Sequence, residues 1–148
     1  MLDVRVSRDD VRVPLALAKV QELAQHVLRW ERCRAAALDI TFISNSAIAR
    51  LNRRHLGHVG TTDIVTFAHG DTVSEGPTVA DIYIAPAVAS ANALAFGSGG
   101  REEIARLVIH GVLHALGMEH PDDESRVTSV MWRRQERWLA RARRESLI

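Results

Sequence analysis

The amino-acid sequence predicts an α+β fold: a single domain with one four-stranded mixed sheet and about five helices. Two short segments, at 2–7 and 36–44, alternate apolar and polar residues with the period of two that half-buried strands show, and two further short segments, at 63–68 and 78–85, also read as strands. Longer segments between and after them repeat apolar residues at helical spacing. The length of 148 residues, with 47% hydrophobic and 25% charged residues, suits one globular domain that buries its own core. Residues 1–148 are therefore expected to form one domain, without an internal repeat or a long linker.

The first half of the chain starts with an expected strand at 2–7, where Leu and Val alternate with Asp, Arg and Ser. Pro14 precedes an expected helix at 15–32, because proline is favoured at the start of a helix. A second alternating segment predicts a strand at 36–44. Ser44 or Ser46 can then cap a helix that reaches about Arg54.

In the second half, strands are expected at 63–68 and 78–85, and Pro86 starts a short alanine-rich helix. The Gly-Ser-Gly-Gly run at 97–100 predicts a flexible joint before a helix at 101–116. Asp122 or Ser125 is expected to cap a final helix that ends at about Arg144. The apolar side of that helix is predicted from four residues at helical spacing: Val127, Val130, Met131 and Trp138.

The helix at 101–116 carries the most informative motif, the run His-Gly-Val-Leu-His-Ala-Leu-Gly-Met-Glu-His at 110–120. His110 and His114 are four residues apart, so they stand on one face of a helix, one turn above the other. Gly117 can end the helix in the left-handed conformation, which lets the chain bring His120 towards the other two. Three neutral imidazoles that converge suit a divalent cation, above all zinc. No fourth protein ligand is evident, so the sequence predicts a metal site on a central helix with one open, catalytic position.

The spacing of these residues also matches the metzincin protease motif, except directly after the first histidine. Those proteases have a general-base glutamate where this chain has Gly111. Without a glutamate there, a zinc-activated water lacks its proton acceptor and the leaving amine lacks its proton donor. Peptidase activity is therefore not predicted. A metal-dependent hydrolase of peptide or small-molecule bonds stays an alternative, with Glu119 or Asp81 as the base.

The run at 110–120 resembles the hallmark of the YbeY endoribonucleases, His-Gly-x-Leu-His-x-x-Gly-[aromatic]-Asp-His. The glycine at position 111 belongs to that hallmark, whereas Met118 and Glu119 are mild departures from it. The resemblance extends over most of the chain. It implies a zinc-dependent, single-strand-specific endoribonuclease that acts in ribosomal RNA maturation, at the 3′ end of the small-subunit rRNA, and in ribosome quality control. Its partners would be ribosomal RNA and the small ribosomal subunit.

Under this resemblance, one Zn²⁺ per chain is expected at His110, His114 and His120, which would act in catalysis through the metal-bound water. Either that water attacks phosphorus, or the metal polarises a phosphoryl oxygen while the 2′-hydroxyl of the RNA attacks. The residues leave this choice open. A non-enzymatic alternative is a ribosome-assembly factor whose metal mainly fixes the fold.

Three further polar residues are candidates for the cleft beside the metal or for the support of a ligand histidine. Asp81 stands in the apolar run Val-Ala-Asp-Ile-Tyr-Ile, where a carboxylate must be exposed, hydrogen bonded or paired with a cation. It either accepts an N–H from a ligand histidine or lies exposed on an edge strand. Thr62 and Asp63 match a Thr-Asp pair of the family, and they either line the cleft or only lead from a loop into a strand.

The expected RNA contacts depend on a departure from the family. The family usually has an arginine, which resembles a phosphate contact, at the position that Leu56 occupies here. Arg53 and Arg54 lie closest in sequence and are the candidate RNA-binding residues. The arginines of the last helix are interpreted as a solvated face, and Trp132 and Trp138 as packing groups, rather than as an RNA track.

Composition limits the partners and the compartment. A net charge of +1 gives no global attraction to nucleic acid, so any such attraction comes from local patches. Cys33 is the single cysteine, so there is no intramolecular disulfide and no cysteine-based metal site, as in a reducing cytoplasm. The N-terminal residues lack the pattern of a signal peptide, and the charge-poor segment 78–97 is interrupted by Asp81 and Pro86. A cytoplasmic protein without a membrane partner is expected.

Overall fold

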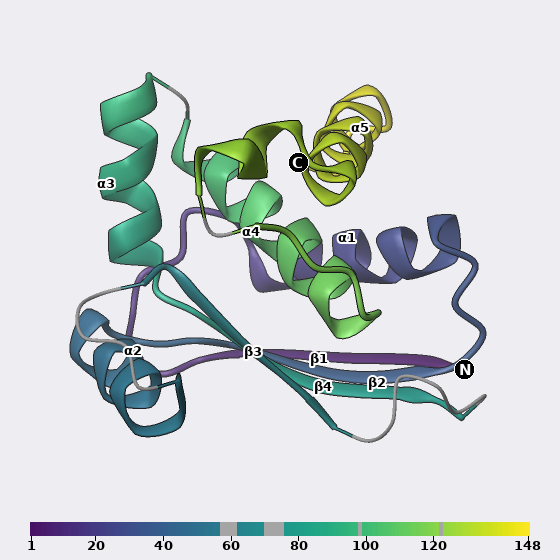
Figure 1. The fold of residues 1–148 in the computed structure, drawn as a ribbon, viewed down its shortest axis with the longest axis horizontal. Coiled ribbons are helices and arrows are strands. Elements are labelled where there is room, and N and C mark those ends of the chain that lie inside the picture. The colour runs from purple at the N-terminus through teal and green to yellow at the C-terminus, as the bar shows by residue number, and fades with distance from the viewer. Residues whose placement is uncertain (57–61, 70–75, 98, 122) are drawn as a thin grey trace.

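The computed structural model describes residues 1–56, 62–69, 76–97, 99–121 and 123–148. The predicted α+β class is confirmed, because four strands form one mixed sheet in the order β1-β2-β4-β3 and five α-helices occur in the described ranges (Figure 1). The strands are β1 (Leu2–Arg8), β2 (Ala36–Phe42), β3 (Ile64–His69) and β4 (Thr78–Ile84). The helices are α1 (Leu17–Trp30), α2 (Asn45–Leu51), α3 (Pro86–Phe96), α4 (Gly100–Ala115) and α5 (Val130–Arg144).

The pairing of the strands fixes which side chains face the helices. β1, β2 and β4 run parallel, and β3 pairs antiparallel with β4 at the edge of the sheet. Ile40 pairs with Ile82 and both are fully buried, whereas the neighbouring pair Asp39 and Asp81 points to the other face. This alternation gives the sheet one apolar face, and the central helix packs on that face.

Helix α4 is the centre of the molecule. It packs against β3, β4, α1, α3 and α5, and Figure 1 shows these helices on one side of the sheet and α2 on the other. Most side chains of α4 are buried, which is the pattern of a helix surrounded by protein. After its first turn, its polar residues follow a spacing of three or four and so form one stripe, which consists of Glu103, Arg106, His110 and His114.

The sheet approaches the backbone of α4 most closely at Gly111. A Cβ atom at this position would lie 2.9 Å from Ile82 Cγ2 and 3.1 Å from Ile64 Cδ1. Glycine in a helix costs about 0.5–1 kcal/mol relative to alanine, and close packing of β3 and β4 against the helix offsets that cost. Glycine at position 111 therefore allows α4 to pack closer to the sheet than a larger residue would.

Helix α5 begins later than the sequence predicted. Ser129 is its N-cap, with its Oγ accepting from Trp132 N at 3.2 Å, so the predicted cap at Ser125 is wrong. Asp123 caps a preceding 3₁₀ segment, Glu124–Thr128, and the alternative cap Asp122 lies outside the described residues. The start of α5 was ambiguous in the sequence because several neighbouring Asp and Ser side chains can each accept a hydrogen bond from a backbone N–H in the first turn of a helix.

The predicted apolar side of α5 is confirmed at Met131, which is buried, and at Trp138, which packs against the core, but it is wrong at the two valines. Val127 and Val130 are 49% and 60% exposed, and Val127 belongs to the 3₁₀ segment. The buried side consists of residues at helical spacing counted from the later start: Met131, Gln135, Leu139 and Ala142. One of these four, Gln135, is polar.

Ser44, one of the two predicted caps, caps α2, since its Oγ accepts from Ala47 N at 3.2 Å. The α-helix ends at Leu51 and continues as a π-helical turn, Asn52–Leu56, so the predicted α-helix through Arg54 is too long. The other predicted element bounds agree within about two residues. No helix in the described ranges is long and apolar enough to cross a membrane, and Cys33 is a free cysteine.

Candidate metal centre

The structure brings His110, His114 and His120 together. The centroids of their rings are 4.6, 4.9 and 5.0 Å apart, and one possible ligand nitrogen from each lies within 4.8 Å of the other two. The first two residues stand one turn apart on α4. Gly117 ends the helix with φ +95°, the left-handed conformation that the sequence predicted, and the chain then returns His120 to the other rings.

Each imidazole is oriented by an oxygen atom at its Nδ1. His114 Nδ1 lies 2.9 Å from the Met118 carbonyl oxygen and His120 Nδ1 lies 2.8 Å from the Pro121 carbonyl oxygen. A carbonyl can only accept, so both Nδ1 atoms donate and carry the proton. His110 Nδ1 is 2.7 Å from Gln135 Oε1. A histidine protonated at Nδ1 carries its lone pair on Nε2, and this is the form in which a histidine coordinates a metal through Nε2.

These residues fit a divalent cation. Three imidazoles converge, each has an oxygen partner at Nδ1, and the set supplies three nitrogen ligands, which leaves one position of a tetrahedral zinc site open. The pKa of His110 is lowered to about 4 by burial and by the proximity of His114, against which the hydrogen bond to Gln135 acts. His110 is therefore neutral and able to coordinate a metal in mildly acidic as well as neutral solution.

The low pKa of His110 predicts that the metal-free protein loses stability on acidification. An unfolded chain takes up this proton near pH 6.5, whereas the folded chain does so near pH 4. Between these values the unfolded state binds more protons, so the stabilising contribution is complete above pH 6.5 and is lost as the pH falls towards 4. We expect up to about 2 kcal/mol less stability at pH 5 than at pH 7 from this group.

Urea unfolding in the presence of a chelator at both pH values measures this loss, with His110→Gln as the comparison. The variant lacks the titrating ring, so its stability should depend less on pH than that of the parent protein. Equal pH dependence in the two proteins would show that burial does not suppress protonation of His110.

A cavity of about 470 Å³ opens beside His110. It is lined by the residue before β3 and by residues from β3, α3, α4, the 3₁₀ segment and α5: Asp63, Ile64, Asn92, Glu103, Arg106, Leu107, His110, Arg126, Val127, Trp132 and Gln135. Asn92 Nδ2 donates to Asp63 Oδ2 at 3.3 Å, and burial raises the pKa of the Asp63 carboxyl, with opposing effects of its hydrogen bonds and of Arg126. The cavity thus combines polar groups, a tryptophan and a cation next to the three histidines.

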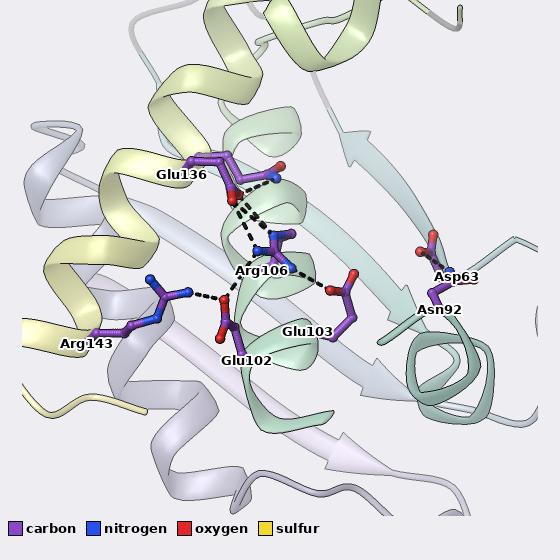
Figure 2. A network of polar contacts seen from close by, with 8 residues as sticks. Asp63, Asn92, Glu102, Glu103, Arg106, Glu136 and Arg143 are labelled. Carbon is purple, nitrogen blue, oxygen red and sulfur yellow. Dashed lines mark hydrogen bonds and ion pairs between the residues drawn. The ribbon is translucent and has the colours of Figure 1, made fainter. Parts of the chain in front are cut away.

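Arg106 lies in the wall of this cavity and is neutralised by carboxylates (Figure 2). Its guanidinium donates to Glu136 at 3.0 and 3.1 Å and to Glu103 at 2.5 Å. Arg126, in contrast, has an exposed side chain whose guanidinium stands 6.0 Å from the centroid of the Trp132 ring. Arg126 is therefore better placed than Arg106 to meet an anionic group that enters the cavity.

The structure separates the three polar candidates near the centre. Asp63 lines the cavity, whereas Thr62 donates its hydroxyl to the Ile64 carbonyl at 3.3 Å and is not among the described lining residues. Asp81 does not approach the three histidines. It faces the side of the sheet away from α4, on an internal strand, and its Oδ2 lies 2.7 Å from His69 Nε2. Strand alternation, set by Ile82 under Gly111, sends the Asp81 carboxylate to that face.

Arg53 and Arg54 are exposed in the π-helical turn that follows α2. Helix α2 packs through Ile48 on Val65 and Phe67, which face the same side of the sheet as Asp81. Neither arginine is among the described residues that line the cavity. The expectation about the Leu56 side chain lies outside what the structure describes.

Sequence reasoning missed several residues of the centre, namely Asn92, Glu103, Arg106, Arg126 and Gln135. Two signals could have indicated two of them. Gln135 interrupts an apolar stripe, and Arg106 continues the spacing of the two helix histidines by one turn. Asn92 and Arg126 carry no such signal, because their positions depend on how α3 and the 3₁₀ segment pack against α4.

An α+β fold in which the central helix and the turn after it bring three histidines together, with His110 lining a cavity, defines a metallohydrolase-like protein. The chain belongs to the YbeY endoribonuclease family: the family model Endoribonuclease YbeY matches residues 4–143. A protein of that name from Chlorobium phaeovibrioides is 34% identical over 129 residues, which are 86% of this chain and 83% of the relative. One from Syntrophus aciditrophicus is 27% identical over 90% of this chain and 85% of its own.

The fold also has a solved counterpart. The solution structure of TM1509 from Thermotoga maritima superposes with a TM-score of 0.63 and 23% sequence identity, and covers 96% of this chain and 90% of that one. At this level of identity the likeness concerns the fold alone.

Proposed function

We propose that this protein is a zinc-dependent endoribonuclease specific for single strands, with one Zn²⁺ per chain held by His110, His114 and His120. The observation that carries the proposal is the convergence of three imidazoles, each with an oxygen partner at Nδ1, at the edge of a cavity. Membership of the endoribonuclease family supports RNA as the substrate. Bound zinc would polarise a phosphoryl oxygen and activate a water or a 2′-hydroxyl at neutral pH.

The residues of the chain would bind and orient the RNA. Arg126 would contact a phosphate. Trp132, which the sequence indicated as a packing group, would instead offer a face to an unpaired base, because it lines the same cavity. The Asp63–Asn92 pair would hydrogen bond to a base edge or a sugar hydroxyl. A cavity of about 470 Å³ suits one extruded nucleotide better than a base-paired one, which supports specificity for single strands.

We extend the proposal to the maturation of the small-subunit rRNA 3′ end and to ribosome quality control, with ribosomal RNA and the small subunit as partners in the cytoplasm. This part rests on the family resemblance. Residues 1–148 would act as one domain.

The experiment compares cleavage of a single-stranded RNA, the same RNA annealed to its complement, and casein. We expect cleavage of the single strand alone, and its loss in a chelator. Cleavage of casein, or equal cleavage of the duplex, would contradict the proposal.

The RNA contacts can be located by the salt dependence of binding. Replacing Arg126 with alanine should lower the slope of log K against log salt by about 0.7, as expected for one phosphate contact in a single strand. The double variant Arg53→Ala, Arg54→Ala tests whether a longer strand also reaches the π-helical turn, in which case the slope falls further. Arg5→Ala is the matched control, because Arg5 is an exposed arginine on β1, at the other edge of the sheet. An unchanged slope in Arg126→Ala would place the phosphate contact outside the cavity.

A further inference from the structure

Gln135 is a polar residue in an apolar place. It is 1% exposed and belongs to the buried side of α5 with Met131 and Leu139. A buried amide is costly unless its donors and acceptor find partners. Gln135 has two partners: its Oε1 lies 2.7 Å from His110 Nδ1, and its Nε2 lies 3.1 Å from Glu136 Oε2. The side chain therefore connects a histidine of the candidate metal centre to a carboxylate.

The Glu136 carboxylate determines which way the amide points. Arg106 donates to it through Nε at 3.0 Å and through Nη2 at 3.1 Å, so Glu136 is held as an ionised acceptor. A carboxylate accepts hydrogen bonds only, so the atom of Gln135 that faces it must be the NH₂ group. The carbonyl oxygen of the amide then faces His110, and Nδ1 of His110 must donate to it. The contacts thus select one orientation of the amide and one tautomer of the ring.

Arg106 is itself fixed from several directions. Figure 2 shows it between Glu103, Glu136 and Glu102, and Glu102 also pairs with Arg143 of α5. Arg106 precedes His110 by one turn of α4, so the contacts run from α4 to α5 and return to α4 at the histidine. The packing of α4 against α5 therefore fixes the positions of both Arg106 and His110 relative to Gln135 and Glu136.

We propose that Gln135 is a positioning residue of the metal centre: it holds His110 as the Nδ1–H tautomer, and the Arg106–Glu136 ion pair sets the direction of its amide. This inference rests on the proposed metal site. His114 and His120 obtain the same tautomer from backbone carbonyls, which substitutions do not remove. Among the described contacts of the three Nδ1 atoms, that of His110 is the one made by a side chain, so His110 is the ligand whose tautomer a substitution can change.

The experiment needs neither RNA nor cleavage. The imidazole ¹⁵N spectrum of the metal-free protein reports the tautomer of His110, and competition with a chelator reports zinc affinity. Gln135→Met removes both polar contacts at similar size, whereas Gln135→Glu keeps an acceptor opposite His110 but loses the donor to Glu136, so it isolates the contact with the histidine. Glu136→Gln removes the charge that orients the amide, and with it the ion pair to Arg106, and leaves Gln135 itself unchanged. Leu139→Ala, one turn along the same buried side of α5, is the control for a purely structural effect.

We expect Nδ1–H at His110 in the parent protein and in Gln135→Glu. In Gln135→Met the Nε2–H tautomer should appear and zinc affinity should fall about 10–100-fold. In Glu136→Gln a smaller share of Nε2–H should appear, and this variant carries the test if Gln135→Met does not fold. Leu139→Ala should lower the unfolding midpoint and leave the tautomer of His110 unchanged.

Three results would overturn the inference: an unchanged tautomer in Gln135→Met, an unchanged tautomer in Glu136→Gln, or an equal change in Leu139→Ala. Failure of the proposed function looks different. A parent protein that takes up no zinc refutes the metal site, while the ¹⁵N spectrum still decides whether Gln135 sets the tautomer. Zinc uptake without RNA cleavage refutes the nuclease and leaves the inference intact.

Discussion

Replacing His114 with alanine is expected to abolish RNA cleavage and to weaken zinc binding by more than about 100-fold. The centroid of the His114 ring lies 4.6 Å from that of His110 and 4.9 Å from that of His120. Its loss leaves two imidazoles, fewer than the three protein ligands of a catalytic zinc site. Loss of a residue that only supports a ligand costs about 10–100-fold in metal affinity, so loss of a ligand itself should cost more.

Elemental analysis and cleavage of single-stranded RNA measure the two effects of this substitution. His69→Ala is the matched control, because His69 lies on β3 and pairs with Asp81 on the face of the sheet away from α4. The control should keep both metal and cleavage. Full metal content and full cleavage in His114→Ala would show that the metal site lies elsewhere.

Replacing Gly111 with glutamate is expected to destabilise the protein by about 3 kcal/mol or more, and not to produce a peptidase. The new side chain would start 2.9 Å from Ile82 Cγ2 and 3.1 Å from Ile64 Cδ1, between the helix and the apolar face of the sheet. A carboxylate there would be buried without a partner, which is strongly unfavourable. The position that carries a base in metzincin proteases faces the sheet here, so it cannot reach a substrate.

Gly111→Ala separates the effect of volume from that of charge. The added methyl overpacks the contact with Ile82, at a cost of about 1–3 kcal/mol, while alanine gains up to about 1 kcal/mol in helix propensity. We expect a net loss of about 1 kcal/mol in the free energy of unfolding. Urea unfolding of both variants, with casein and RNA assays, measures these effects. A Gly111→Ala protein that is more stable and fully active would contradict the structural role of this glycine.

Much of the fold could be predicted because local patterns agree with the final packing. Alternation in the strands, the Ser44 cap and the left-handed Gly117 are local signals, and the structure confirms them. The convergence of His110, His114 and His120 followed from helix spacing and one turn, since the three lie within eleven consecutive residues. Such a site depends on few tertiary contacts.

The surroundings of the site could not be predicted in the same way, because they depend on contacts between distant segments. Gln135 reaches His110 only because α5 packs on α4, and Asp63 meets Asn92 only because β3 and α3 flank the same helix. Asp81, in contrast, was a candidate from the sequence that lies away from the three histidines. Its position in an apolar strand suggested support of a ligand, but strand register alone decides the face, and the register places it beside His69.

The most direct test of the central claim is a titration of the metal-stripped protein with Zn²⁺ during cleavage of a single-stranded RNA. If one ion at His110, His114 and His120 supports the reaction, cleavage should be absent in the stripped protein, rise with added zinc and reach its maximum at about one equivalent per chain. Cleavage that persists in the fully stripped protein, or that stays absent after one equivalent has bound, would contradict the claim.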